Sequence, residues 1–473
     1  MRKSLFWTVV MGLCTSCGSD GADPDPGAGG AAGMPSGAGT SGELAGAGRA
    51  GSVSHAGTSG GGSAGTSPGS AGASPEGGSA GSAGSAGSAG TGGMQPAVDL
   101  SIELFDPEHV PHFELELSPE AMAALDADAD TYVRGTLRYG MEVVQDIGVR
   151  LKGEGSFRPL ARKAAFKLKF DEFVKDQSFR GLRRLTLNNM VEDPSFLAER
   201  LAYEFFRFAG LPAPRANSAR VSVNGASYGL YAHIETEDKT FLRRWFESDD
   251  GNLYEEGQTD FVPGAEMLFD LETNETANDR TDLANLISVF QAARPETYLA
   301  DLDAALDTEH FLRFTAAEAA VNQWDMYAYT VFYPNNFRLY HDPIASQFVF
   351  LPWGMDMSMK PFRDSGKPHI ALLELSRRGD LTSTPVTTGL MFQRCLTSMS
   401  CRATYIEVAR EIIELYEQAD LKASAGRYYE QIQPLVEADP RKEYTLQQFE
   451  AGYAALIRTI EERPQAMRTS IGD

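Results

Sequence analysis

A glycine-, alanine- and serine-rich stretch at residues 18–97 sets the tightest limit on what this 473-residue chain can fold into. It contains the repeat GSAGSAGSAG and almost no large apolar side chain. Such a segment cannot bury enough apolar surface to offset the conformational entropy lost on ordering, so we expect a flexible tether. A coil of this length would have a root-mean-square span of about 50 Å. The residues that can form a core are therefore 98–473.

The residues before the tether have the features of a secretory signal. Arg2 and Lys3 precede an apolar run from Leu5 to Leu13, and small residues lead to Cys17. That run is too short to span a bilayer as a stable helix. We therefore predict a signal peptide at residues 1–17 and an exported protein at the cell surface or in the periplasm. Cys17 follows a small residue, as in bacterial lipoproteins, so membrane attachment through a lipidated Cys17 and plain cleavage are the two alternatives.

Charge and cysteine usage narrow the partners of the folded part. The formal net charge is -23, which argues against nucleic acid or an anionic membrane as a partner because both would be repelled. Cys395 and Cys401 are close together in a chain that we expect to be exported. A local disulfide is therefore favoured over a metal site.

Hydrophobic periodicity predicts an α+β fold, β-rich in its N-terminal part and mainly helical in its C-terminal part. Alternating residues predict strands at 98–105, 112–117, 132–137, 143–151, 165–170, 219–223 and 228–235. Capping signals and apolar spacing predict helices at 193–210, 239–246, 282–293, 299–306, 310–322, 389–396, 403–417, 421–438 and 446–462. Residues 251–278 are acidic and irregular, as in a surface insertion or lid.

Two features in the β-rich part suit a phosphate. Lys152 opens a glycine-containing turn that ends at Ser156, and glycines let backbone N–H groups approach a phosphate closely. In the strand at 165–170, alternation places Lys167 and Lys169 on the face opposite the apolar residues. The alternatives are an ordinary hairpin turn and solvated lysines on an edge strand.

A third feature lies between residues 322 and 356. Asp325 follows an alanine-rich helical run, Asn335 and Asn336 come about ten residues later, and Asp356 follows an apolar strand. Carboxylate and amide oxygens are the ligands that Mg²⁺ prefers, so this segment predicts a Mg²⁺–phosphate centre for phosphoryl transfer. The alternative is structural, with Asp325 capping a turn and Asp356 in a loop.

Protein kinases use the same order of parts: phosphate loop, strand Lys, helix Glu, catalytic Asp, metal-binding Asn and metal-binding Asp. The kinase motifs V-A-I-K, H-R-D and D-F-G are absent. Several blocks instead resemble the spore coat protein H (CotH) kinase family over residue 98 to the C-terminal helices. These blocks are IGVRLKG from Ile147, FKLKF from Phe166, DPSFL from Asp193, Asn224-Gly225 with GLY from Gly229, Asn336 with Leu339-Tyr340, and Pro352-Trp353 with Asp356.

The resemblance implies an atypical, kinase-like two-lobed domain at 98–473 that uses ATP and Mg²⁺ to phosphorylate protein hydroxyls. It implies Asp325 as the catalytic or hydroxyl-orienting group, Asn336 and Asp356 on the metal, and Lys167 on the phosphates. Lys152 and Ser156 would line the phosphates. Lys163 and Lys169 are alternatives to Lys167, and Glu199 or Glu204 would be the partner of the lysine.

Two positions depart from the family pattern. Gly354 stands where the family usually has the first acid of Pro-Trp-Asp-x-Asp, and Glu154-Gly155 replaces the usual Asn and Ser. One carboxylate fewer weakens metal binding. The second hypothesis is therefore a catalytically degenerate surface protein with a binding, adhesion or structural coat role.

Overall fold

The computed structural model describes residues 99–153, 155–330, 333–361, 369–374, 386–387 and 389–473. All of them belong to one compact unit, Thr91–Asp473. The predicted signal peptide, the tether and Cys17 lie outside the described residues. Within the described residues, no helix is both long and apolar enough to cross a membrane.

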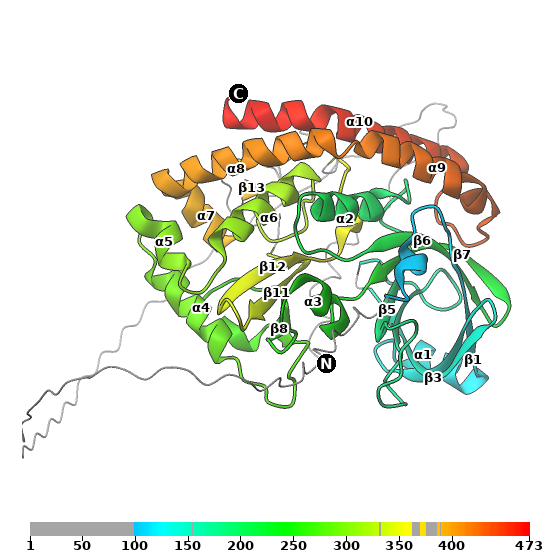
Figure 1. Cartoon of the computed structure of the whole chain (residues 1–473). Coiled ribbons are helices and arrows are strands. Elements are labelled where there is room, and N and C mark those ends of the chain that lie inside the picture. The colour runs from blue at the N-terminus through cyan, green and yellow to red at the C-terminus, as the bar shows by residue number, and fades with distance from the viewer. Residues whose placement is uncertain (1–98, 154, 331–332, 362–368, 375–385, 388) are drawn as a thin grey trace, which may run out of the picture. The chain divides into compact units, whose positions relative to one another are not determined.

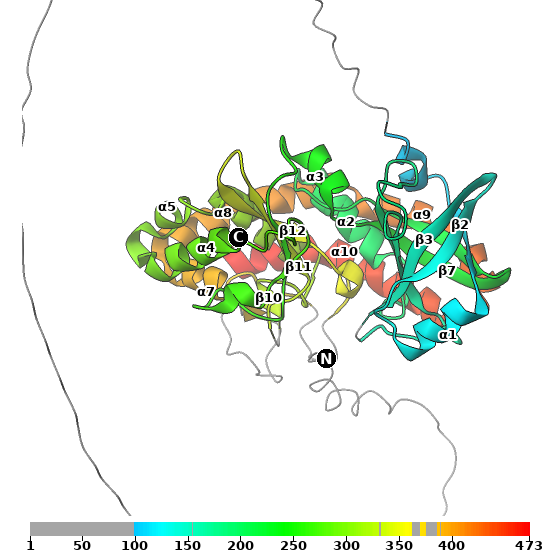
Figure 2. The same ribbon diagram turned by 90° about the horizontal axis from the view of Figure 1, so that it is seen from below.

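The N-terminal part is a closed barrel in which the strands follow the order β1-β2-β3-β4-β5-β7-β6. Neighbouring strands are antiparallel except β1 and β6, which pair in parallel and close the barrel. Figure 2 shows the barrel with α1 (Pro119–Ala127) at one end. The barrel strands are β1 (His112–Leu117), β2 (Val133–Tyr139), β3 (Glu142–Lys152), β4 (Ala165–Lys169), β5 (Arg184–Asn188), β6 (Ala216–Val223) and β7 (Ala226–Glu235).

The C-terminal part is mainly helical and surrounds a small sheet of order β12-β11-β8-β9. Its strands are β8 (Leu253–Glu255), β9 (Asp270–Leu271), β11 (Phe337–Asp342) and β12 (Gln347–Pro352); β10 (Tyr329–Thr330) pairs separately with β13 (Val386–Thr387). The helices are α2 (Ala198–Phe208), α3 (Lys239–Trp245), α4 (Thr281–Ala292), α5 (Tyr298–Leu302), α6 (Thr308–Ala320), α7 (Leu390–Thr397), α8 (Met399–Gln418), α9 (Leu421–Ala438) and α10 (Leu446–Ile471). Short 3-10 turns are η3 (Ile102–Phe105), η4 (Ala265–Met267), η5 (Pro295–Thr297) and η6 (Met355–Met357).

Two elements join the barrel to the helical part. α2 packs against β6 of the barrel and against η6, and its buried aromatic residues belong to the large core of the helical part. α9 contacts β7, and Figure 1 shows α9 and α10 lying side by side above β6 and β7. The disulfide between Cys395 and Cys401 (S–S 2.00 Å) ties α7 to α8, which confirms the predicted local bridge.

The predicted division into a β-rich and a helical part is confirmed, but three local predictions are wrong. Residues 99–105 are not a strand, because the Asp99 carboxylate accepts the Ser101 N–H (2.9 Å) and η3 follows. The helix expected from Asp193 begins at Ala198, because the Asp193 carboxylate caps it from five residues upstream (2.8 Å to the Ala198 N–H). The acidic stretch 251–278 is not all irregular, since it contributes β8 and β9. The closed seven-stranded barrel also differs from a plain kinase lobe.

One buried histidine makes the barrel sensitive to acid. His233 on β7 donates from Nε2 to the Leu104 carbonyl (2.6 Å), and its ring stacks on Phe105 with centroids 4.5 Å apart. Burial lowers the pKa of His233 to about 3. The folded protein therefore keeps this imidazole neutral at a pH where the unfolded chain protonates it.

We expect His233→Phe to reduce the loss of stability at acid pH. Below its ordinary pKa of about 6.5 the histidine takes up a proton only in the unfolded chain, so the free energy of unfolding falls by about 1.4 kcal/mol per pH unit. In the variant, Asn217 Nδ2 still donates to the Leu104 carbonyl (3.3 Å). Urea unfolding at about pH 7 and about pH 4.5 should show a wild-type loss about 3 kcal/mol larger than that of the variant. Equal losses in the two proteins would contradict this role.

Candidate functional site

Asp325 lies on a loop that a buried carboxyl group of α6 holds in place. Glu318 accepts hydrogen bonds from the backbone N–H groups of Ala328 (3.0 Å) and Tyr329 (2.8 Å). Burial raises the pKa of Glu318 to about 8, and the two hydrogen bonds act against that rise. The loop after α6 is therefore anchored to a rigid helix, as the alanine-rich run before Asp325 suggested.

Two amides hold the Asp325 carboxyl group. Asn335 Nδ2 and Asn336 Nδ2 both donate to Asp325 Oδ2, at 3.3 and 3.0 Å, and Asn336 Nδ2 also donates to the Asp325 carbonyl (2.7 Å). Burial and then the negative charge of Asp356 raise the pKa of Asp325 to about 7, against the lowering effect of the two amides. Asp325 can therefore gain or lose a proton near neutral pH.

Asp356 follows β12 and lies in η6, behind a left-handed turn at Gly354 (φ 59°, ψ 55°). Asn336 also has a positive φ of 51°, and its carbonyl accepts the Trp353 N–H (3.1 Å). A Cβ at position 354 would overlap the Asn336 side-chain oxygen and lie 2.6 Å from its Cγ. Asn336 therefore fills the space that a side chain at position 354 would need.

A chain of polar side chains connects the barrel to α2. Lys152, the last residue of β3, donates to Asn188 Oδ1, and Asn188 Nδ2 donates to both oxygens of Glu199 (2.8 and 2.7 Å). Burial lowers the pKa of Lys152, and the charges of Glu199 and Asp356 oppose that change. Hydrogen bonds thus run from the Lys152 ammonium group through the Asn188 amide to the Glu199 carboxyl group, from the barrel to α2.

The structure separates the two candidate glutamates of α2. Glu199 is buried beside the site, and burial followed by the charge of Asp356 raises its pKa to about 8. Glu204 instead accepts hydrogen bonds from Ser424 Oγ (2.6 Å) and Tyr428 OH (2.8 Å) of α9. Glu199 belongs to the candidate site, and Glu204 attaches α2 to α9.

The other lysines have different surroundings. Lys163 forms a buried ion pair with Asp439 (2.6 Å), and Lys169 pairs with Glu172 (2.7 Å). Burial lowers the pKa of Lys167 to about 8, and the nearby carboxylate of Glu255 opposes that change. Lys163 and Lys169 are thus engaged elsewhere, which leaves Lys152 and Lys167, of the four lysines that the sequence suggested, in the site.

Trp353 lies among three cationic side chains. Its ring centroid is 5.6 Å from Lys152 Nζ, 6.0 Å from Lys167 Nζ and 4.5 Å from the Arg338 guanidinium carbon. Arg338 is buried and donates from Nη2 to the Glu255 carboxylate (2.9 Å). The indole and the neighbouring carboxylate therefore hold like charges close together at the barrel side of the site.

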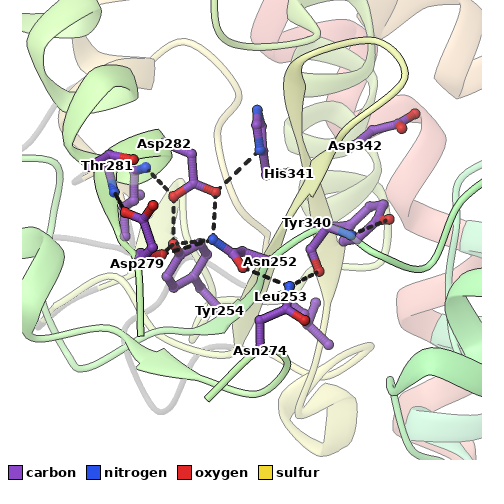
Figure 3. Close-up of polar contacts among 12 residues, drawn as sticks. Asn252, Leu253, Tyr254, Asn274, Asp279, Thr281, Asp282, Tyr340, His341 and Asp342 are labelled. Carbon is purple, nitrogen blue, oxygen red and sulfur yellow. Dashed lines mark hydrogen bonds and ion pairs between the residues drawn. The ribbon is translucent and has the colours of Figure 1, made fainter. Parts of the chain in front are cut away.

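A polar network holds β8, which carries Glu255, against β11 and α4. The Asp282 carboxylate accepts hydrogen bonds from Asn252 Nδ2 (3.0 Å) and Tyr254 OH (2.6 Å), and His341 Nδ1 lies 3.2 Å from it. Figure 3 shows these side chains converging on Asp282 from separate elements. The β8 end of the acidic stretch is therefore held in place, and it carries Glu255 to Arg338.

The glycine-containing turn after Lys152 is tight. Gly153 has a φ of 108°, and a Cβ there would lie 2.7 Å from Ser156 Oγ. Asn189 Nδ2 holds the turn by donating to the Ser156 carbonyl (2.9 Å). Ser156 Oγ thus lies against Gly153, the residue after Lys152, while Glu154 lies outside the described residues.

The oxygen groups of the site suit a divalent cation. Burial and then repulsion from the negative charge of Asp356 raise the pKa of Asp325, and the Asn336 amide oxygen lies against Gly354 on the Asp356 loop. A hard cation would relieve that repulsion. Across the described residues no cluster of three or more His, Cys, Asp or Glu side chains forms a metal site, so further ligands would come from the phosphates.

One open hollow in the described part of the chain lies elsewhere. It has a volume of about 600 Å³ and is lined by α9 and α10 residues that include Gly426, Tyr453 and Ile457. No titratable pair with a strongly shifted pKa lines it. The candidate site around Asp325 and this hollow are therefore separate places in the structure.

Sequence reasoning missed four residues of the site. Asn188, Glu255, Arg338 and Lys360 were not singled out. Lys360 Nζ donates to the Glu192 carbonyl (2.6 Å), and its positive charge lowers the pKa of Asp325. The pair of amides directly after the apolar residues of β5 was a usable signal for Asn188, since a buried amide at a strand end needs polar partners.

Comparison with known proteins identifies related chains. The family model described as CotH kinase protein matches residues 149–467. Inner spore coat protein H of Bacillus subtilis (strain 168) is 23% identical over 308 residues, which is 63% of this chain and 80% of that protein. An inner spore coat protein H-like protein of the same strain is 37% identical over 88 residues, or 19% of this chain and 27% of that protein.

Among solved structures, the crystal structure of the Helicobacter pylori proinflammatory kinase CtkA aligns with 72% of this chain and 89% of its own. The aligned residues are 10% identical, and the TM-score is 0.28.

We expect Gly354→Ala to destabilise the protein by about 3 kcal/mol, because left-handed backbone costs about 1 kcal/mol for alanine and overlap with Asn336 adds about 2 kcal/mol. Denaturant titration measures this loss. Gly264→Ala is the matched control, since Gly264 has a φ of 85° and nothing within 4 Å of a new Cβ. It should cost only about 1 kcal/mol.

The same experiment in an Asn336→Ala background separates the two contributions. Removing the amide should abolish the excess cost of Gly354→Ala and leave the backbone cost. If Gly354→Ala and Gly264→Ala cost the same in the wild-type background, Asn336 does not fill the space at position 354.

Proposed function

Because the chain belongs to the CotH kinase protein family, we propose that it is an atypical two-lobed kinase. It transfers the γ-phosphoryl group of ATP, with Mg²⁺, to hydroxyl groups of a protein. One observation carries this proposal: the carboxyl groups of Asp325 and Asp356 lie within electrostatic reach of each other and of the Lys152–Asn188–Glu199 chain. Phosphoryl transfer needs positioning and charge neutralisation more than covalent chemistry from the protein.

In this proposal Asp356 and Asn336 hold the metal through their side-chain oxygens. A bound Mg²⁺ would supply charge neutralisation at the phosphates. Asn336 is suited to this place because Asp325 occupies its Nδ2, so its side-chain oxygen stays free to act as a ligand.

Lys152 and Ser156 line the phosphates, with Lys167 beside them. Lys152 is the better placed lysine because its ammonium group donates to Asn188, which Glu199 holds, whereas the carboxylate that acts on Lys167 is that of Glu255. Glu199 acts through Asn188 and is a positioning residue. The tight turn at Gly153 brings Ser156 back toward Lys152.

Asp325 orients the accepting hydroxyl group and takes its proton. The hydroxyl oxygen forms a bond to the γ-phosphorus, the bond from that phosphorus to the β,γ-bridging oxygen breaks, and ADP leaves with the bond's electron pair. The hydroxyl proton passes to the Asp325 carboxylate. A pKa near 7 allows this group to accept the proton and release it again at neutral pH.

We further infer an exported protein attached to a surface. The signal-like residues 1–17 and the low-complexity residues 18–97 support this inference, with Cys17 as the point of lipid attachment. The relative named inner spore coat protein H supports a coat or surface location.

A degenerate, non-catalytic member of the family is the second candidate function. Gly354 favours it, because the acid expected there is absent and Asn336 fills its space. Such a protein would keep the fold and act by binding, adhesion or as a structural coat component.

We expect Asp325→Asn to leave Mg-ATP binding nearly intact and to lower phosphate transfer by about 10²–10⁴-fold, the usual contribution of a general base. Transfer by the wild type should rise with pH through about 7, as the carboxylate forms, and this rise should vanish in the variant. The assay is transfer of radiolabelled γ-phosphate by the full chain to itself and to casein.

Asp356→Ala serves as the comparison, because it should abolish the dependence of nucleotide binding on Mg²⁺. Equal transfer by wild type and Asp325→Asn would refute the catalytic role. Absence of transfer and of Mg-ATP binding in the wild type would favour the non-catalytic function.

The two lysines give a further test. We expect Lys152→Met to weaken Mg-ATP binding by about tenfold and Lys167→Met to weaken it by about twofold. Lys152 is held by the Lys152–Asn188–Glu199 chain, and a charge-assisted contact to a phosphate is worth about 1.5 kcal/mol or more. Both variants remove one ammonium group of similar burial, so each controls for the other in calorimetric titrations. If Lys167→Met weakens binding more than Lys152→Met does, Lys167 is the lysine that binds the phosphates.

A further inference from the structure

The connector between α9 and α10 holds the loop that follows Lys152. Glu443 on this connector receives Arg158 as a two-pronged pair (Nε to Oε1 2.8 Å, Nη2 to Oε2 2.7 Å) and Arg162 Nη2 at 2.6 Å. The side chains of Arg158 and Glu443 are only 19% and 17% exposed. A planar guanidinium held at two points fixes both the distance and the orientation of the loop.

Other contacts of the same connector reinforce this attachment. Arg441 Nη1 donates to the Leu160 carbonyl (2.8 Å), and Asp439 forms the buried ion pair with Lys163. A Cβ at Gly229 would overlap the Asp439 carboxylate, whose Oδ2 also accepts the neighbouring Leu230 N–H (3.0 Å). The connector is therefore seated against both the loop and β7 of the barrel.

The loop attached in this way is the one that carries Ser156. Asn189 Nδ2, in the segment between β5 and α2, donates to the Ser156 carbonyl (2.9 Å). Arg158, which pairs with Glu443, comes two residues after Ser156. Tyr444 OH, on the same connector, donates to the Val191 carbonyl (2.6 Å), in the segment that precedes α2. One short connector thus touches both the loop that carries Ser156 and the segment that leads to Glu199.

We propose that Glu443 is a positioning residue for the phosphate-binding turn. By holding Arg158 and Arg162 it keeps Ser156 at the distance from Lys152 that phosphate binding requires. This role rests on the proposed nucleotide-binding function. It makes the connector between α9 and α10 a support of the proposed site.

The test compares Glu443→Ala with Glu417→Ala in the full chain. Glu417 forms a similar two-pronged pair with Arg468 (2.6 and 2.8 Å), between α8 and α10 and outside the site. Calorimetric titration with Mg-ATP and with magnesium tripolyphosphate should show about fivefold weaker binding of both by Glu443→Ala. Glu417→Ala should bind both as the wild type does. Arg158→Lys, which keeps the charge but not the fork, should fall between Glu443→Ala and the wild type.

Amide exchange without ligand gives an independent reading and does not depend on nucleotide binding. Residues 155–162 should lose protection in Glu443→Ala and keep it in Glu417→Ala. If amide exchange is unchanged in Glu443→Ala, the positioning role is wrong. It is also wrong if the wild type binds Mg-ATP and Glu443→Ala binds it equally well. Neither outcome contradicts the proposed function. Failure of the wild type to bind either probe overturns the proposed function, and the phosphate-positioning role with it. If Glu443→Ala does not fold, Arg158→Lys provides both readings.

Discussion

The site depends on the cost of keeping several carboxyl groups close together away from water. Asp325, Asp356 and Glu199 lie in one small region, and burial together with the charge of Asp356 raises the pKa of both Asp325 and Glu199. A buried carboxylate is tolerated only with hydrogen bonds or opposite charge. Here amides supply the hydrogen bonds and Lys152 supplies the charge. The surrounding elements are arranged to deliver those partners: the end of β5 brings Asn188, the start of β11 follows Asn336, and the last residue of β3 is Lys152.

Much of the fold was predictable because alternation and capping are local signals. The barrel strands β1 to β4, β6 and β7 and most helices were expected near their observed positions. The short β5 was missed because its five residues give too little alternation to be recognised, and β8 and β9 were hidden in an acidic segment. The parallel pairing of β1 with β6, which closes the barrel, joins residues about a hundred positions apart and leaves no local trace. Strand pairing of this kind is set by tertiary packing rather than by propensity.

The candidate site was predictable in part for the same reason. Asp325, Asn336 and Asp356 come from consecutive elements, so their order along the chain already suggested a common location. Glu199 and Glu204 could not be separated from the sequence. Five residues on a helix turn by about 500°, so the two side chains point about 140° apart, but periodicity alone does not say which face meets the barrel. Lys152 was ranked below Lys167 because its partner Asn188 comes from a strand that had not been recognised.

The position of Gly354 bears on whether the site still works as a metal centre. Loss of the acid at this position removes one negative charge, which by itself lowers the repulsion around Asp356. Yet the charge of Asp356 still raises the pKa of Asp325, whose carboxyl group Asn336 holds. In a site with only a structural role, apolar residues of similar size would commonly be as stabilising or more so. A divalent cation would offset the remaining repulsion, and its oxygen ligands are already held in place by Asn336 and the left-handed turn at Gly354. The surviving carboxylates therefore favour a reduced metal site over a purely structural one.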